Sequence, residues 1–409
     1  MKKVLKKKAR KTLNFFSALY YLLLFCLFEN RKIRKSDIVF FFPVYHTGGA
    51  ERVHLNIVKS VQGKKSCVLF TQNSNTVNFL ASFQKLSEVI LINKIVTKKN
   101  KLLIKVLKKI IIKSLNKNHN LETVFSSNAT FFYELLPFLD QRINKIDLIH
   151  AFSYPDLGIE DDSISAVEYL DYRVVINEKT KLDLISQYKT NNIDSAYNER
   201  IIKIENGIEI DDNSFYQKDA GKIKIGFVGR WAHEKRPELF LQIAKNVIPN
   251  FPNAQFEMLG TGMKSNKKSI DSAGVLFLGE VTNKDSLREI YKNMTFLLIT
   301  SSREGFPMVI MEAMAHGVVP ITTNVGGITE HIVNDENGIV IDDTDEQIIV
   351  EKFTASIAEL IMNINYREKI AQNAYLYAHN NFQIQKFNDS YKKLLFRQTD
   401  LKNEHIFQK

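Results

Sequence analysis

The stretch that decides the fold runs from Lys222 to Pro237 and reads K-I-K-I-G-F-V-G-R-W-A-H-E-K-R-P. Its first part, Lys222–Gly229, is a short apolar strand that closes on glycine, and a helical pattern follows over Glu238–Val247. A strand, a basic loop and a helix form the turn that binds phosphate in parallel α/β folds. Arg230 offers a bidentate fork and Lys235 a mobile point charge, which together suit a diphosphate. The alternative is a solvated basic loop.

A second turn lies between Glu304 and Glu312 and reads E-G-F-P-M-V-I-M-E. The backbone N–H groups of Gly305 and Phe306 and a helix start behind them are suited to a pyrophosphate. Pro307 is expected at the first helical position, where a missing N–H costs little. Glu312 then lies two turns along the helix, and a carboxylate there suits a pair of ribose hydroxyls. The alternative is an ordinary helix start with scattered acids.

Strands and helices alternate through the rest of the chain, which predicts parallel sheets covered by helices. A polar segment over 208–221 carries four acids and no clear periodicity, so it is expected to be a linker between two halves. We therefore expect an α/β protein with two doubly wound sheets and a ligand cleft between them. The main expected strands are Ile38–Phe42, Ser66–Thr71, Lys145–Phe152, Gln255–Leu259, Thr295–Ile299 and Val318–Thr322.

Several fragments between Lys222 and Asp343 occur in an order that resembles the C-terminal domain of retaining GT-B glycosyltransferases of family 4. They are F-V-G-R-W-x-x-E-K, F-E-M-L-G-T-G, F-L-G-E-V, the two glutamates eight apart, and P-x-x-x-x-V-G-G-I-x-E from Pro320. In the first half, F-P-V-Y-H-T-G-G-A-E-R-V from Phe42 resembles the first glycine-rich loop of that family. The fragment I-D-L-I-H-A-F-S from Ile146 carries His150 at the end of an expected strand, close to where the family has a catalytic-site histidine. The resemblance covers the chain from about Asp37 onward.

The resemblance implies a GT-B architecture, in which two Rossmann-like domains face a cleft. It places an N-terminal Rossmann-like, acceptor-side domain at 36–207 and a linker at 208–221. A nucleotide-sugar-binding domain then occupies 222–382, and a last helix over 383–409 crosses back to the first domain. Residues 1–35 remain as a basic and apolar helical extension.

The resemblance also implies roles for individual residues. His150 would lie near the reacting face of the sugar as a hydrogen-bond donor or charge stabiliser, and Glu304 would lie beside the donor sugar. Transfer would retain the anomeric configuration, with departure and attack on the same face. A double displacement is disfavoured because Glu312 is assigned to the ribose. The residues expected to bind the donor are Gly48, Gly49, Arg230, Lys235, Gly305, Phe306 and Glu312.

No metal site and no cofactor beyond the nucleotide diphosphate sugar is expected. The acids in Asp342-Asp343-Thr344-Asp345 resemble a metal cluster, but a solvated loop explains them better. Arg236 stands where the family frequently has glycine, so the loop after Lys235 is expected to be less tightly turned. Two cysteines, Cys26 and Cys67, are too few for a disulfide scaffold and favour a reducing cytoplasm.

The formal charge of +11 is concentrated at the N-terminus. Residues 1–35 hold eleven Lys or Arg and one acid, a net charge of +10, which leaves only +1 for the remaining residues. This distribution disfavours nucleic acid as a partner. The apolar run over 12–28 is slightly short for a spanning helix and lacks a cleavage site. Basic flanks on both sides favour a helix that lies in or dips into an anionic membrane surface over a buried soluble helix.

A second basic helix is expected over Lys101–Leu115, in which lysines line one face and apolar residues fill another. The apolar face is expected to contain Leu103, Val106, Leu107, Ile110 and Ile111. No acid occurs from Val89 to Leu121, so the lysines have no partner nearby in the sequence. A core-packed helix with a solvated lysine side is equally compatible. The resemblance favours membrane docking.

These observations predict a metal-independent hexosyl- or related glycosyltransferase. It would move a sugar from a nucleotide diphosphate sugar to a glycan or lipid-linked acceptor. The expected place is the cytoplasmic face of the membrane, where the protein would be peripheral or anchored, in bacterial surface polysaccharide synthesis. The alternatives are a non-catalytic sugar-nucleotide-binding scaffold protein of the same fold, and a hydrolase or epimerase acting on nucleotide sugars.

Overall fold

The computed structural model describes residues 2–153, 156–210, 215, 218–219 and 221–397, with side chains from residue 10 onward. The chain divides into two compact units. Unit 1 comprises Met1–Val175, Lys181–Ile204 and Asn388–Lys409, and unit 2 comprises Ile176–Thr180 and Glu205–Phe387. Parts of the predicted linker (211–214, 216–217 and 220) and of the predicted last segment (398–409) lie outside the described residues.

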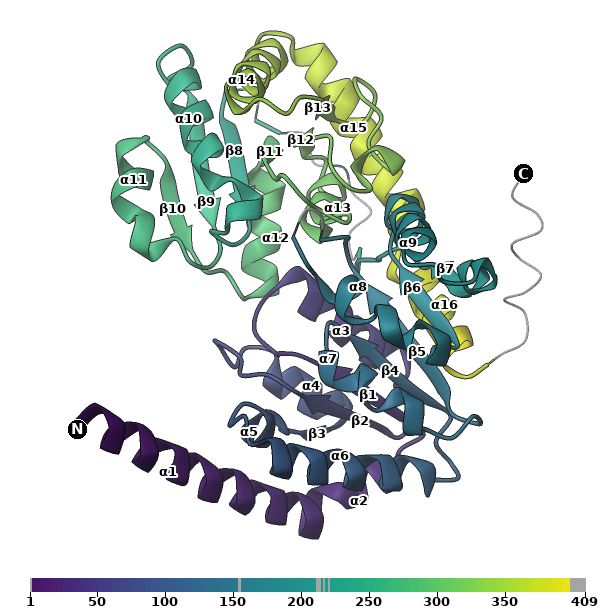
Figure 1. Ribbon diagram of the computed structural model, residues 1–409. Helices are drawn as coiled ribbons and strands as arrows, with labels where there is room; N and C mark the ends of the chain where they lie inside the picture. Colours follow the sequence, from purple (N-terminus) through teal and green to yellow (C-terminus); the bar gives the residue numbers. More distant parts are fainter. Residues whose placement is uncertain (1, 154–155, 211–214, 216–217, 220, 398–409) are drawn as a thin grey trace. The chain divides into compact units, whose positions relative to one another are not determined.

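Unit 1 is built on a seven-stranded sheet with the order β3-β2-β1-β4-β5-β6-β7, and every strand pair in it is parallel (Figure 1). Its central strands are buried along their full length because helices cover both faces, so they are nearly continuous apolar runs. The strands are β1 (Ile38–Phe42), β2 (Ser66–Phe70), β3 (Glu88–Ile90), β4 (Thr123–Ser127), β5 (Asn144–Ile149), β6 (Tyr172–Val175) and β7 (Ile201–Lys203).

The helices of unit 1 connect these strands. The last helix of the chain, α16 (Ile384–Leu395), has its C-terminal end in this unit, where Thr123 Oγ1 donates to the Leu395 carbonyl at 2.6 Å. The connecting helices are α3 (Gly49–Ser60), α4 (Leu80–Leu86), α5 (Asn93–Val96), α6 (Lys101–Asn116), α7 (Thr130–Tyr133), α8 (Ile159–Asp162) and α9 (Glu178–Thr190).

The N-terminal extension is helical, as predicted. It consists of α1 (Lys2–Leu24), a π-helical turn over Phe25–Glu29 and α2 (Asn30–Arg34). It runs beside α5 and α6 (Figure 1), and Ala18, Leu22 and other inward side chains join the core of unit 1. The segment from Arg10 to Arg34 is long and apolar enough to cross a membrane by length and composition alone.

Helix α6 corrects one detail of the prediction. Leu103, Leu107 and Ile111 are buried against the core, but Val106 is 37% exposed and lies outside the apolar face. The buried residues recur every four positions, so the face of α6 that packs on the core of unit 1 is narrower than the predicted apolar face. Lys108 also has an acidic partner that is remote in sequence, because it forms an ion pair with Glu134.

Unit 2 contains a six-stranded parallel sheet with the order β10-β9-β8-β11-β12-β13. Its strands are β8 (Ile223–Val228), β9 (Ala254–Leu259), β10 (Leu276–Gly279), β11 (Phe296–Ile299), β12 (Val319–Thr323) and β13 (Ile339–Ile341). Its helices are α10 (Pro237–Val247), α11 (Lys267–Ser272), α12 (Lys284–Asn293), α13 (Met308–Met314), α14 (Glu346–Met362) and α15 (Ile364–Asn381).

The strand order reverses between β1 and β4 in unit 1 and between β8 and β11 in unit 2. Ligands of doubly wound sheets bind outside the carboxyl ends of the strands at such switch points. The loops that follow β1, β8 and β11 carry Gly48, Arg230 and Glu304. Both predicted doubly wound sheets are therefore present, and Gly48, Arg230 and Glu304 lie in loops at the carboxyl ends of their strands.

Candidate functional site

In unit 2, the loops after β8 and β11 meet through an ion pair. The Lys235 ammonium lies 2.5 Å from Glu304 Oε1, and Ser301 Oγ donates to the same oxygen at 2.6 Å. The side chains of Lys235 and Glu304 are 24% and 9% exposed, so the carboxylate is more enclosed than the ammonium. Two residues predicted to act on the donor are thus brought together.

Arg230 lies in the same loop but is less constrained. Its guanidinium is 55% exposed, and its Nη2 lies 3.4 Å from Glu234 Oε1. An exposed pair at this distance contributes little stability. The fork of Arg230 therefore remains accessible for an anionic ligand.

Arg236 corrects the expectation that the loop is less tightly turned. Its φ and ψ are 45° and 55°, the left-handed conformation that glycine adopts most easily. Its side chain bonds across to the β11 loop, since Nε donates to the Thr300 carbonyl at 2.6 Å and Nη2 to the Ser301 carbonyl at 2.9 Å. The turn thus keeps its glycine-like form, and the guanidinium ties together the two loops that carry Lys235 and Glu304.

Gly305 and Phe306 can contact a ligand through their backbone N–H groups rather than through side chains. The Phe306 ring is buried, and its centroid lies 4.3 Å from that of His331. Gly327 N donates to the Gly305 carbonyl at 2.7 Å. A Cβ on Gly326, whose φ is +59°, would lie 1.9 Å from the Glu304 carbonyl oxygen. The double glycine of the V-G-G-I fragment therefore supports the loop that carries Glu304.

Glu312 lies on α13 and has a partner from a different element. Glu312 Oε2 accepts a hydrogen bond from Tyr291 Oη at 3.0 Å, and Tyr291 belongs to α12. The Glu312 carbonyl lies 2.7 Å from His316 Nδ1, and burial lowers the pKa of His316. Pro307 is the N-cap of α13 rather than its first helical residue, so the predicted position was wrong by one. The helix has only seven residues, which limits the field at its start.

In unit 1, Gly48 and Gly49 form the start of α3. A Cβ on Gly48 would lie 2.1 Å from Glu51 Oε2, whereas one on Gly49 would meet nothing within 4 Å. Glu51 is 8% exposed, and its Oε1 lies 3.5 Å from His46 Nε2. The Glu51 carboxylate can therefore occupy its position beside the turn only because residue 48 has no side chain.

His150 follows β5 and pairs with a residue that sequence reasoning missed. Its Nε2 lies 3.1 Å from Nε2 of His54, which is completely buried on α3. The His54 ring stacks on Phe42, with centroids 4.2 Å apart and an interplanar angle of 3°. Burial lowers the pKa of His150 to about 4, and it lowers the pKa of His54 well below the ordinary value. Both imidazoles are therefore neutral near pH 7.

The acids after β13 have structural partners. Asp343 forms an ion pair with Lys352 at 2.9 Å, and the Asp345 carboxylate accepts the N–H groups of Gln347 and Ile348 at the start of α14. Among the residues that the structure describes, no group of three or more His, Cys, Asp or Glu side chains has an arrangement that could hold a metal ion.

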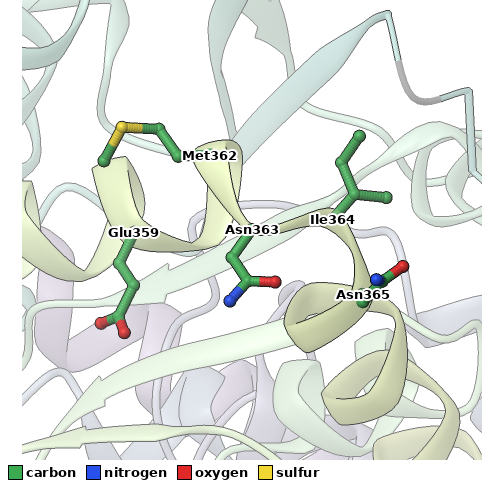
Figure 2. A pocket seen from close by; sticks show the side chains of 5 residues that line it. All are labelled: Glu359, Met362, Asn363, Ile364 and Asn365. Atoms are coloured by element: carbon green, nitrogen blue, oxygen red, sulfur yellow. The ribbon is translucent and has the colours of Figure 1, made fainter.

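The open hollow in Figure 2 is remote from these residues in the sequence. It lies where α14 ends and α15 begins, and none of the predicted site residues lines it. Its lining side chains are Glu359, Met362, Asn363, Ile364 and Asn365.

Comparison with known proteins identifies the class. Residues 210–377 match the model of the family described as glycosyl transferases group 1. The chain is 32% identical over 167 residues to the capsular polysaccharide biosynthesis glycosyltransferase CapM of Staphylococcus aureus, covering 39% of this chain and 42% of CapM. It is 34% identical over 128 residues to the O-antigen biosynthesis glycosyltransferase WbnH of Escherichia coli, covering 31% of this chain and 35% of WbnH. The chain thus spans less than half the length of both relatives.

A solved structure shows the same fold. The chain resembles Anabaena Alr3699/HepE, which was crystallised in complex with UDP-glucose, with 17% identity and a TM-score of 0.68. The alignment covers 88% of this chain and 99% of HepE. The predicted GT-B architecture of two Rossmann-like domains with an N-terminal helical extension is therefore confirmed.

Proposed function

We propose that this chain is a retaining glycosyltransferase that moves a hexosyl or related sugar from a nucleotide diphosphate sugar to a glycan or lipid-linked acceptor. Three things support the proposal: the group 1 family match, relatives named for capsule and O-antigen synthesis, and the geometry of the β8 and β11 loops. HepE, a TarM mutant and the pneumococcal O-GlcNAc transferase GtfA were crystallised with UDP, which supports a nucleoside diphosphate as the leaving group.

The observation that carries the proposal is the state of Lys235. An ammonium has three N–H donors, and among the described residues only the Glu304 carboxylate receives one of them. The other two donors can hold phosphate oxygens while Glu304 keeps the ammonium in place. The exposed Arg230 guanidinium adds a second positive charge, and the N–H groups of Gly305 and Phe306 add neutral hydrogen-bond donors in the adjoining loop. A developing negative charge on a diphosphate is stabilised by such preorganised donors.

The remaining site residues take the roles that the motifs imply. Glu312 would bind the ribose hydroxyls, held in place by Tyr291. Glu304 would lie beside the donor sugar, and His150 beside its reacting face. Gly48 and Gly49 would bring backbone toward the diphosphate. No metal and no further cofactor is part of this scheme, because cationic side chains and N–H groups supply the positive charge.

The proposed place of action is the cytoplasmic face of a membrane, in bacterial surface polysaccharide synthesis. The outer side of the N-terminal extension presents an apolar stripe at alternating intervals of three and four residues, and the sequence is basic both before this stripe (Lys2–Lys11) and after it (Arg31–Lys35). Its inner side packs on unit 1, so we propose that α1 lies along the membrane surface rather than crossing it. The exposed apolar residues are Leu13, Phe16, Tyr20, Leu23 and Leu27.

Thermal unfolding with a panel of UDP- and GDP-sugars tests the donor assignment. A ligand at 100 times its Kd adds about 2.7 kcal/mol, which corresponds to a rise in Tm of roughly 3 °C for a chain of this length. We expect at least one sugar nucleotide to give such a shift, with or without EDTA. Lys235→Ala and Glu312→Ala should abolish the shift.

Lys267→Ala is the matched control, because it removes an exposed lysine that forms an ion pair with Asp271 four residues further along the same helix. An undiminished shift in Lys235→Ala would refute the assignment of that residue. A shift that EDTA removes would refute metal independence. A second assay measures consumption of the donor, which should increase when a lipid-linked acceptor is added. A rate of consumption that is the same with and without acceptor would favour a hydrolase. Binding without any consumption would favour the scaffold.

A further inference from the structure

The two histidines of unit 1 form a pair whose protonation pattern can be worked out. His54 Nε2 and His150 Nε2 are 3.1 Å apart, a hydrogen-bond distance that requires one proton between the two nitrogens. Because both rings are neutral near pH 7, each carries a single N–H. Two arrangements are possible, and they differ in which ring donates.

The surroundings of His54 distinguish the two arrangements. His54 Nδ1 is buried and has no hydrogen-bond partner. If His150 were the donor, His54 would carry its proton on Nδ1 and bury an unpaired N–H group. If His54 is the donor, Nδ1 is only an unpaired acceptor. Orphaned buried donors are rarer than under-satisfied acceptors, so the second arrangement is favoured.

We infer that His54 is a positioning residue that donates its Nε2–H to His150 and thereby fixes the proton of His150 on Nδ1. The bond a histidine makes with one nitrogen determines the state of the other. His150 then presents an N–H donor, rather than an acceptor or a cation, as its remaining polar group. In terms of the proposed function, on which this consequence rests, the donor would bond to a hydroxyl of the transferred sugar.

Nitrogen-15 NMR of the full-length chain at pH 7.5 tests the tautomers directly, and it does not depend on any enzymatic activity. The histidine signals are assigned by comparison with His54→Phe and His150→Phe. We expect a protonated Nδ1 and an unprotonated Nε2 in His150, and the opposite pattern in His54. The reverse pattern, or two charged rings, would overturn the inference.

Substitutions of His54 distinguish a role in positioning His150 from a role in packing alone. His54→Phe keeps an aromatic ring against Phe42 but removes the donor, whereas a glutamine side chain carries an amide N–H close to the position of Nε2. The activity measured is release of UDP from UDP-glucose or UDP-N-acetylglucosamine. We expect kcat to fall about tenfold or more in His54→Phe, with Tm and KM for the donor nearly unchanged, and to recover largely in His54→Gln.

An unchanged kcat in His54→Phe, or equal losses in both variants, would leave His54 as a packing residue and refute the positioning role. If the wild-type chain cleaves neither donor, the proposed donors fail, while the NMR result still decides the tautomers. The two failures are therefore distinguishable.

Discussion

At the scale of single residues, the chemistry of the site depends on contacts that join distant parts of the sequence. Lys235 and Glu304 are 69 residues apart, and His54 and His150 are 96 apart. The first pair could be anticipated because both members belong to recognisable motifs. His54 could not, because a lone histidine on an amphipathic helix has the same sequence pattern as any buried polar residue. Its partner becomes visible only when β5 and α3 are placed in three dimensions.

The histidine pair predicts a loss of stability in mild acid. Folding holds the pKa of His150 near 4, against an ordinary value of 6.5, and also depresses that of His54. Between pH 6.5 and 4 the unfolded chain therefore binds more protons than the folded chain. The stabilisation is complete above pH 6.5 and is lost as the pH falls, by at most about 1.4 kcal/mol per pH unit for each group.

Urea unfolding at pH 7.5 and 5.5 measures this effect. We expect the wild-type chain to lose about 2 to 3 kcal/mol more between the two pH values than the double variant His54→Phe/His150→Phe. His119→Gln is the control, because His119 is an exposed histidine outside the buried pair. Identical pH slopes in wild type and double variant would contradict the burial of two neutral rings.

At the scale of secondary-structure elements, the sequence predicted strands and their order better than it predicted turns. The apolar run of β8 and the glycine after it define a buried parallel strand, and this strand lies at Ile223–Val228. Val106 was assigned to the wrong face because periodicity does not show how wide the contact of a helix with its core is. Arg236 was misjudged because its left-handed conformation is maintained by bonds to carbonyls of a loop 64 and 65 residues away.

The turn at Arg236 gives a prediction in which glycine is better than alanine. Both Arg236→Gly and Arg236→Ala lose the bonds to Thr300 and Ser301, so the difference between them reports backbone strain. A non-glycine residue in the left-handed region costs about 1–2 kcal/mol. We expect Arg236→Gly to be more stable than Arg236→Ala by about 1 kcal/mol in urea unfolding. The same two changes at Arg230, which does not have a positive φ, should give no advantage to glycine.

At the scale of the whole molecule, the resemblance in sequence identified the class and the two sheets, whereas the charge distribution singled out the N-terminal extension. Composition could not tell whether residues 12–28 cross a membrane or lie on one, because both arrangements need an apolar helix. The packing of Ala18 and Leu22 in the core of unit 1 is the observation that led us to propose the second arrangement. A helix with one side in the protein core has only its other side to offer to lipid.

Vesicle sedimentation of the full-length chain tests this orientation. We expect binding to vesicles that contain phosphatidylglycerol, and weaker binding at high salt. Replacing Leu13, Phe16 and Leu23 by Asn should reduce binding at least tenfold, because three apolar side chains are lost from the interface. The control replaces three exposed apolar residues of unit 2, Val333, Met362 and Leu376, by Asn. Equal losses in both triple variants would contradict a specific membrane face.

Gly326 has a consequence for inheritance. Any missense change in a glycine codon adds at least a methyl group, and here that group would collide with the Glu304 carbonyl oxygen at 1.9 Å. No single-nucleotide substitution that alters this amino acid can therefore be accommodated without displacing the peptide that precedes Gly305. A descendant gene that encodes another residue at position 326 would also need a compensating change in the loop that carries Glu304. The substitution and the compensating change would have to be inherited together.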